Sequence, residues 1–194
     1  KKLDVIIKNC FDNLGTTETV KMLDHIKEMG YKYSTIGAIT INVFDMVIPQ
    51  EKDKMVKDAE KEVLQNEMFY QRGFITLNEK LGRNIQLWKD VTKKLEGLVL
   101  STMDPLNPVR MMADSGARGS IKQVLQLCGM RGLMANTSGR EVDIPVKSNF
   151  RSGLTPIEYF ISSRGGRKGL ADKVLKTADS GYLTRRLEAV AQEI

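Results

Sequence analysis

The residue best placed to do chemistry is an arginine that lies between small residues, directly ahead of an amphipathic helical pattern. The run ADSGARGS presents Arg118 just before IKQVLQLCGM, so its guanidinium is expected at the N-terminus of a helix. Guanidinium groups match the oxygens of phosphate, and the free backbone N–H groups of a first helical turn also favour anions. The pattern therefore indicates an anion-binding arginine, although a capped helix with a surface arginine has the same short sequence.

Other side chains that could catalyse a reaction or hold a metal are scattered along the chain. Asp114 and Asp179 are isolated carboxylates, and the single histidine, His25, has no neighbour at metal-ligand spacing. Cys10 and Cys128 are far apart and belong to no CxxC pair, which favours reduced, buried thiols over a disulfide or a zinc site. We therefore expect no catalytic residue and no metal site in this sequence.

The element that must position this chemistry is a long helix predicted for residues 155–194. Thr155, Pro156 and Glu158 supply an N-cap hydroxyl, a proline at the first helical position and a carboxylate at the third, which together form a capping box. No proline follows in the rest of the chain. At about 1.5 Å per residue such a helix reaches roughly 60 Å, far beyond the length of an ordinary globular helix.

Glycines interrupt this helical pattern, and two explanations for them remain open. They are Gly165, Gly166, Gly169 and Gly181. Each interior glycine costs about 1 kcal/mol relative to alanine, so together they cost about 4 kcal/mol. In the first explanation the helix packs closely against a neighbour, or ends at Gly165 and restarts at Arg167. In the second, the rod must bend, or a nucleic-acid backbone passes close over it.

The N-terminal segment, residues 1–48, has two helical patterns followed by a loop-like stretch. The patterns run over about 3–14 and 17–29 and are separated by Gly15, and the loop-like stretch covers 31–44. Apolar residues on the two patterns are expected to face a core: Val5, Ile6, Phe11, Leu14, Val20, Leu23 and Ile26.

Residues 49–104 have the pattern of an antiparallel helical hairpin. Two helical runs of similar length flank a short turn at Arg72 and Gly73, and Thr76 with Glu79 forms a capping box at the start of the second run. The fold expected from these patterns is mainly α.

The remaining segments are residues 105–153, which carry Arg118, and the long helix over 154–194. Within the first of these, EVDIPVKSNF alternates like a short strand. The expected fold is therefore a helical hairpin and a long C-terminal helix, with small irregular or β segments.

Basic residues are concentrated in the second half of the chain. Residues 1–100 hold 16 Lys and Arg against 15 Asp and Glu, whereas residues 101–194 hold 14 against 9. A positive surface of this kind is what phosphate contact requires. No apolar run approaches the roughly 18 residues of a membrane span, and no signal-peptide pattern opens the chain, so a cytoplasmic location is expected.

Three stretches of the sequence are long and specific enough to carry a resemblance. They are NPVRMMADSGARGS at 107–120, CGMRGLM at 128–134 and YFISSRGGRKGLADKVLKTADSGYLTRRL at 159–187. Together they resemble the β′ subunit, the largest subunit, of bacterial DNA-directed RNA polymerase. The upstream stretches TVKMLDHIKEMGYKYST and FDMVIPQEKDKMVKDAEKEV are similar to the funnel region of the same subunit.

The resemblance implies a function in transcription for each segment. Residues 1–48 would belong to the funnel, 49–104 would be the rim helices of the secondary channel, and 154–194 would be the bridge helix beside the active centre. Residues 105–153 would carry the nucleotide-binding arginine and a loop that supports the bridge helix. In that loop, Arg131 is expected to orient the loop and not to touch substrate.

The resemblance also implies roles for individual residues. Arg118 would reach the triphosphate of the incoming nucleotide, and Met112 would line the neighbouring wall, where a thioether fills irregular gaps. Factors that bind in the secondary channel would dock at the hairpin tip and the start of its second arm. The candidate docking residues are Asn78, Glu79, Gly82 and Arg83.

On the bridge helix, the resemblance places three residues against the template at the position being copied: Lys176, Thr177 and Ala178. Arg185 and Arg186 would approach nucleic-acid phosphates. Gly165, Gly166 and Gly169 would form a flexing point. Arg164 and Gly166 stand where the family more commonly has a histidine and an alanine, which implies a looser and more basic joint here.

Partners and cofactors follow from the same resemblance. The implied partners are the β, α, ω and σ subunits, template DNA, the RNA transcript, nucleoside triphosphates and secondary-channel transcription factors. Mg²⁺ is implied for the intact nucleotidyltransferase, but its aspartate-rich loop and the mobile trigger loop are absent from this sequence. The chain alone is therefore expected to be inactive. The alternative is a basic helical module that binds nucleic acid or a protein partner and has no catalytic role.

Overall fold

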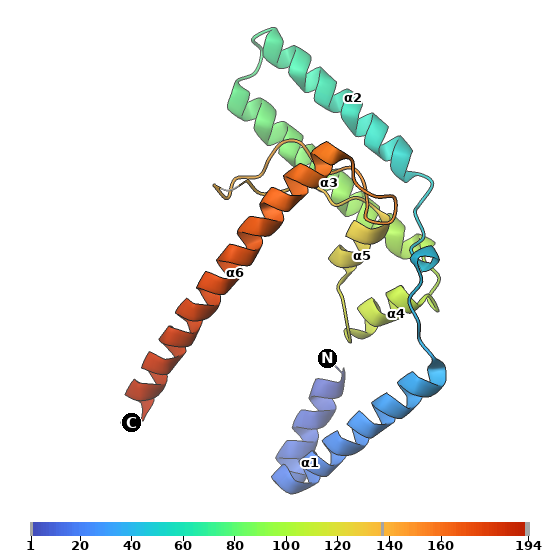
Figure 1. Ribbon diagram of the computed structural model, residues 1–194, viewed down its shortest axis with the longest axis vertical. Coiled ribbons are helices and arrows are strands. Elements are labelled where there is room, and N and C mark those ends of the chain that lie inside the picture. Colours follow the sequence, from blue (N-terminus) through green and yellow to red (C-terminus); the bar gives the residue numbers. More distant parts are fainter. Residues whose placement is uncertain (1, 137, 193–194) are drawn as a thin grey trace. The chain divides into compact units, whose positions relative to one another are not determined.

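The computed structural model describes residues 2–136 and 138–192, and these residues are mainly helical (Figure 1). The elements are α1 (Lys2–Gly37), the short 3-10 helix η1 (Val43–Asp45), α2 (Lys52–Gln71), α3 (Leu77–Thr102), α4 (Pro108–Ser115), α5 (Ile121–Cys128) and α6 (Pro156–Ala191). The prediction of a mainly α fold with a long C-terminal helix is confirmed. The chain forms two compact units, Lys1–Ile41 and Asn42–Ile194.

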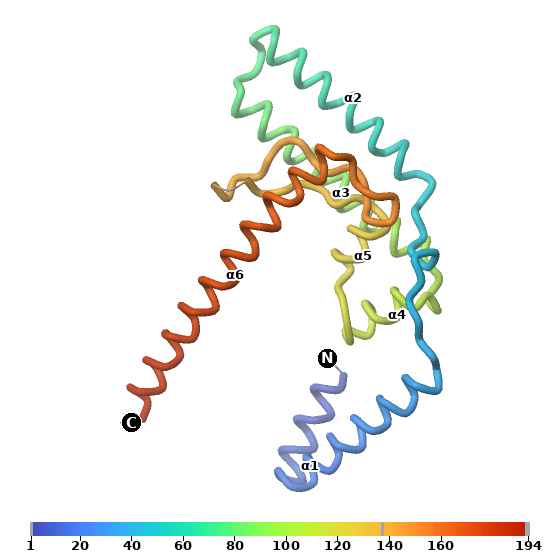
Figure 2. Tube along the Cα trace, in the orientation of Figure 1, coloured from blue at the N-terminus to red at the C-terminus, as the bar shows by residue number. Residues whose placement is uncertain are grey.

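The helix α1 consists of two helical pieces that meet at Gly15. This glycine has φ 76° and ψ −177°, in the left-handed region that favours glycine, and the chain changes direction sharply there (Figure 2). The predicted break at Gly15 is confirmed. The predicted loop is wrong over residues 31–37, because the second piece stays helical to Gly37. Its aromatic and β-branched residues lower helix propensity only slightly, and the helix ends where Ala38 takes φ 45°.

The apolar residues of α1 that the pattern assigned to a core are not buried. Val5, Ile6, Phe11, Leu14, Val20 and Leu23 are each at least 40% exposed, and Ile26 is half-buried. The residue of α1 that is buried is Thr19, whose hydroxyl donates to the carbonyl of Gly15 at 2.8 Å. A unit of about forty residues has too little chain to enclose a core of its own. The two pieces of α1 instead line an open, largely apolar groove.

In the second unit, α2 and α3 form the predicted antiparallel hairpin. Thr76 and Glu79 make the predicted capping box at the start of α3. Side chains near the tip join the two arms: the amide of Asn66 donates to Asn84 at 2.9 Å, and Lys80 contacts Glu67 at 2.8 Å. These cross-links fix the hairpin as one element.

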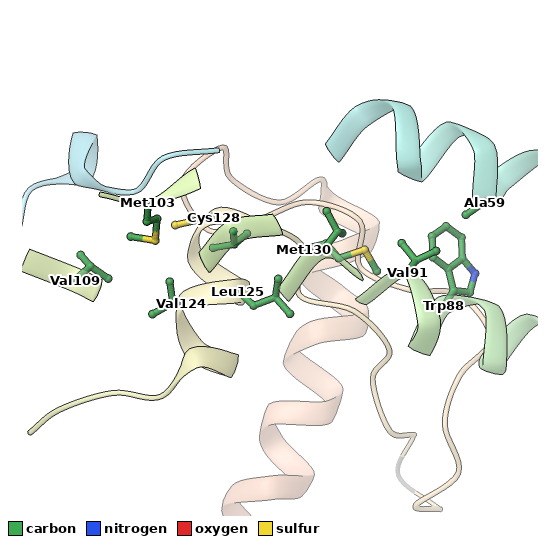
Figure 3. Close-up of a cluster of buried hydrophobic side chains, with 11 residues drawn as sticks. Ala59, Trp88, Val91, Met103, Val109, Val124, Leu125, Cys128 and Met130 are labelled. Carbon is green, nitrogen blue, oxygen red and sulfur yellow. The ribbon is translucent and has the colours of Figure 1, made fainter. Parts of the chain in front are cut away.

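One face of α3 provides the centre of the hydrophobic core (Figure 3). Trp88, Leu95 and Val99 are each at most 2% exposed, and their spacing places them on one side of the helix. The cluster is completed by residues from α2 to α5 and the segment after α5: Ala59, Val91, Met103, Val109, Val124, Leu125, Cys128 and Met130. This core packs α5 against α3, so it fixes the helix that follows Arg118.

The segment between α5 and α6 is an irregular loop and not the predicted strand. The described residues form only two isolated antiparallel bridges here, Gly132 with Val146 and Ala135 with Glu141. Gly132 and Gly139 have φ of 86° and 85°, and Pro145 has no N–H to donate. These residues break any continuous ladder, so alternation in EVDIPVKSNF did not produce a strand. We call residues 129–155 the support loop, Thr137 excepted.

Candidate functional site

The long helix α6 is continuous from Pro156 to Ala191, and Figure 1 shows it as a single unbroken rod. Its predicted capping box is present, because the N–H and hydroxyl of Thr155 donate to the carboxylate of Glu158 at 3.0 and 2.9 Å. In return, the N–H of Glu158 donates to the Thr155 hydroxyl at 3.4 Å. Because the helix runs through Gly165 and Gly166 without interruption, the explanation that it ends and restarts there is wrong.

The carboxylate of Glu158 also holds the support loop. It accepts the backbone N–H groups of Lys147 and Ser148 at 2.9 and 3.0 Å. Partial burial alone would raise the pKa of Glu158, but the hydrogen bonds from Thr155 and Ser148 outweigh it and lower the pKa to about 2. The carboxylate is therefore ionised at neutral pH, where it fixes both the start of α6 and the loop.

Arg131 makes a second contact between the support loop and α6. Its guanidinium donates to the hydroxyl of Ser162 and lies 5.1 Å from the centroid of the Phe150 ring. Ser162 is only 4% exposed, so this hydroxyl is satisfied by a buried contact. Burial lowers the pKa of Arg131, yet a guanidinium keeps its charge in proteins. These contacts support the prediction that Arg131 orients the loop.

The glycines of α6 are of two kinds. A Cβ atom on Gly165 would lie 2.6 Å from the Met134 methyl group and 3.4 Å from the carbonyl oxygen of Ala135. Gly165 therefore lets the support loop pack directly on the helix. At Gly166, Gly169 and Gly181 a Cβ would meet nothing within 4 Å. Close packing thus explains Gly165 and none of the other three.

The part of α6 beyond the support loop is almost fully open. From Gly169 to Gln192, every residue except Asp172 is exposed. This part carries all the predicted nucleic-acid contacts: Lys176, Thr177, Ala178, Arg185 and Arg186. Lys176 and Thr177 line a shallow hollow, where the Thr177 hydroxyl is turned back onto the carbonyl of Lys173 at 2.7 Å. The helix surface at Thr177 therefore has no bulky side chain above it, and the cations Lys173 and Lys176 lie beside it.

Arg118 lies two residues before the N-cap of α5, and its side chain is exposed. Its backbone N–H donates to the carbonyl of half-buried Met112 at 3.4 Å, so the structure brings these two predicted substrate residues together. Gly116 and Gly119 have φ of 75° and 83°, which allows the tight turn on either side of the arginine. Asp114, four residues before Arg118, is paired with Arg110 at 3.3 Å.

The predicted docking residues lie in the first two turns of α3, and all four are exposed. The carboxylate of Glu79 is already engaged, because it accepts the N–H and the hydroxyl of Thr76 at 2.8 and 3.0 Å. The hydrogen bond from the Thr76 N–H lowers the pKa of Glu79 most, and the bond from the Thr76 hydroxyl lowers it further. Glu79 therefore caps α3 through one carboxylate oxygen, and its exposed side chain stays a predicted docking position together with Asn78, Gly82 and Arg83.

Two further observations concern metals and membranes. Among the residues that the structure describes, no group of three or more His, Cys, Asp and Glu side chains could hold a metal ion. Both cysteines are free, Cys128 buried and Cys10 half-buried. No described helix is both long and apolar enough to cross a bilayer.

Comparison with known protein families identifies the class. Models of the largest RNA polymerase subunit match most of the chain: RNA polymerase Rpb1 domain 3 over residues 1–46, domain 4 over 75–165 and domain 5 over 153–194. The chain therefore belongs to the Rpb1 family of RNA polymerase subunits.

Within that family the chain corresponds to the bacterial β′ subunit. It is 51% identical to DNA-directed RNA polymerase subunit beta′ of Pelotomaculum thermopropionicum, 53% to that of Desulforamulus reducens and 52% to that of Clostridium novyi. In each case the match covers the whole chain and 16 or 17% of the relative. The chain thus spans only a small part of the length of these relatives.

Proposed function

We propose that this chain is the part of the β′ subunit that binds the incoming nucleotide, supports the template and flexes as RNA synthesis advances. One observation carries the proposal. The rod α6 is capped and clamped at its N-terminal end, and from Gly169 onward it is exposed, with open glycines, small residues and cations. The names of the β′ relatives, which describe DNA-directed RNA polymerase, support this interpretation.

For the nucleotide, Arg118 is the proposed contact and Met112 lines its neighbouring wall. An exposed guanidinium ahead of the α5 N-terminus adds its charge to the partial positive charge of the helix end, and both favour a triphosphate. The tight turn at Gly116 and Gly119 holds the arginine outside the core. The proposed role is binding and orientation of the triphosphate and not bond chemistry.

For nucleic acid, the distal part of α6 is the proposed surface. A base pair can pack flat against a helix only where bulky side chains are missing, and Thr177 and Ala178 meet this condition beside Lys176. Arg185 and Arg186 are exposed further along and suit backbone phosphates. Gly166 and Gly169 are the proposed flexing point, because a Cβ at either position would meet nothing within 4 Å.

Partners and cofactors follow from this proposal. We expect the β, α, ω and σ subunits, template DNA, the transcript and secondary-channel factors to contact the chain. The proposed docking positions of the factors are Asn78, Glu79, Gly82 and Arg83. The described carboxylates do not fit a Mg²⁺ site, since no acidic cluster of sufficient size is present among them. Mg²⁺ would therefore be held by other parts of the polymerase.

The test is Arg118→Ala in an assembled polymerase, with Lys122→Ala as the matched control. Lys122 is an exposed cation in the first turn of α5, so Lys122→Ala removes one positive charge, as Arg118→Ala does. Losing charge-assisted bonds to phosphate should raise the nucleotide KM by about 10- to 100-fold. Template affinity and its salt dependence should stay unchanged, as should all parameters of the control variant.

Two results would contradict the proposal. An unchanged nucleotide KM would remove Arg118 from the substrate site. Equal losses of nucleotide addition, template affinity and salt slope would instead favour the alternative, a basic helical module that only binds nucleic acid.

A further inference from the structure

We propose that Asn149 is a positioning residue that joins the C-terminus of α5 to the start of α6, so that Arg118 and the clamped start of α6 move as one unit. The inference rests on the proposed function, since it assigns Asn149 a role through Arg118. Asn149 is completely buried, and nothing in the sequence pattern distinguishes it from an ordinary loop asparagine.

The first observation is how the C-terminus of α5 is satisfied. The last carbonyl groups of a helix have no partner within the helix and must find one elsewhere. Here the N–H groups of Phe150 and Arg151 donate to the carbonyls of Gln126 and Leu127 at 3.1 and 3.3 Å. The Asn149 amide donates to the carbonyls of Cys128 and Gly129, each at 3.2 Å. The support loop therefore supplies hydrogen-bond donors to almost all of the unpaired carbonyls at the C-terminus of α5.

The second observation is what lies on the other side of the same residue. The side-chain oxygen Oδ1 of Asn149 accepts a hydrogen bond from the N–H of Ser152 at 2.7 Å. This bond makes a tight turn just ahead of the Thr155 cap of α6. One residue before Asn149, the N–H of Ser148 donates to Glu158 at 3.0 Å. The amide group is thus bonded to α5 through its nitrogen and to the approach to α6 through its oxygen.

This geometry explains why an amide is required. A carboxylate of the same shape would accept from Ser152 but would direct an oxygen at two carbonyl oxygens. An aliphatic side chain would leave those carbonyls and the Ser152 N–H without partners inside the protein. Since α5 is only eight residues long and Arg118 lies two residues before its N-cap, we expect a shift at its C-terminal end to displace the backbone at Arg118.

The experiment is a double-mutant cycle in an assembled polymerase that combines Asn149→Ala with Arg118→Ala. Asn84→Ala is the matched control, because Asn84 is 4% exposed and bonds Asn66 within the hairpin. Asn149→Ala should raise the nucleotide KM about tenfold, whereas the control should change it less than about twofold. In the Arg118→Ala background, Asn149→Ala should add less than about twofold, because the contact it positions is already gone.

Asn149→Asp separates the donor role from simple space filling. It keeps the volume and the acceptor for Ser152 but loses both donors, so it should raise the KM at least as much as Asn149→Ala. A wild-type KM for Asn149→Asp would overturn the inference. If Asn149→Ala prevents assembly, Asn149→Ser leaves a hydroxyl in the joint, and a rise of a few-fold that disappears in the Arg118→Ala background is the expected result.

The remaining outcomes distinguish the two proposals. Multiplicative effects of Asn149→Ala and Arg118→Ala would show that Asn149 acts independently of Arg118, and the inference would fail while the proposed function stands. The same conclusion follows if Arg118→Ala raises the KM and Asn149→Ala does not. If Arg118→Ala itself leaves the KM unchanged, the proposed function fails, and the positioning role fails with it.

Discussion

Replacing Gly166 with alanine tests whether α6 must bend where the support loop ends. An alanine Cβ at this position would meet nothing within 4 Å, so the straight helix accepts it without a clash. Alanine favours the helical state over glycine by up to about 1 kcal/mol, partly because it restricts the non-helical conformations. The substitution therefore penalises a bent conformation and leaves every contact of the straight one in place.

The expected size of the effect follows from this free energy. A difference of about 1 kcal/mol lowers the population of a locally bent helix roughly fivefold relative to the straight helix. If bending accompanies each advance of the template, the rate of translocation in an assembled polymerase should fall by up to about fivefold. Pauses should lengthen, whereas nucleotide KM, which we propose depends on the Arg118 contact, should not change.

The measurement is single-nucleotide addition and pause lifetime along a defined template. Gly181→Ala is the matched control, since it too meets nothing within 4 Å but lies far along the rod from the support loop. Gly165→Ala is unsuitable as a control because its Cβ would displace the Met134 methyl group, 2.6 Å away. Unaltered kinetics for Gly166→Ala, or an equal change for Gly181→Ala, would refute a joint at this position.

Three other perturbations test the parts of the second unit that hold the rod. Glu158→Gln should speed deuterium exchange at the Lys147 and Ser148 amides. Because the pKa of Glu158 is lowered from 4.5 to about 2, its ionised carboxylate stabilises the fold fully above about pH 4.5. This stabilisation is lost as the pH falls toward about 2. Wild-type protection should therefore be flat between about pH 6 and 8, and the contribution is at most about 3 kcal/mol before solvent screening. Leu95→Ala, at a site with 0% exposure, should destabilise the core by about 2–5 kcal/mol in thermal or denaturant unfolding of the assembled subunit. Arg131→Lys keeps the charge but loses the planar fork over Phe150, so exchange near Ser162 should increase.

The features that could be predicted from the sequence are those that nearby residues determine. The capping boxes at Thr76 and Thr155 depend on side chains three residues away, and Gly15 breaks α1 because it can adopt positive φ. The hairpin followed from two helical runs around a short glycine turn. In each case the interaction lies within a few residues, so a local pattern contains all the information that it needs.

The features that were missed depend on residues distant in sequence. The two helical patterns of α1 were correct, but their assignment to a core was wrong: Val5 and Phe11 are exposed because burial needs a surface that this unit lacks. Gly165 and Gly166 are adjacent and chemically identical, and the approach of Met134 and Ala135 to Gly165 distinguishes them. Glu158 was recognised as a cap, but its bonds to the support loop join residues ten and eleven positions apart, and no local pattern encodes them.

The same contacts support the proposed position of the joint in the rod. Glu158, Ser162 and Gly165 each touch the support loop, so three successive turns of α6 are held on one side. The loop is itself tied to the hairpin, because the ammonium group of Lys147 contacts Glu60 at 2.6 Å. A half-exposed ion pair of this kind contributes at most about 1 kcal/mol, so we expect the part-buried bonds of Glu158 and Arg131 and the buried bonds of Asn149 to provide most of the restraint. Beyond Gly165 the close packing on the helix axis stops, since Gly166 is the first glycine of the rod at which a Cβ would meet nothing within 4 Å. We therefore propose that a lateral force on the distal helix would bend it first at Gly166.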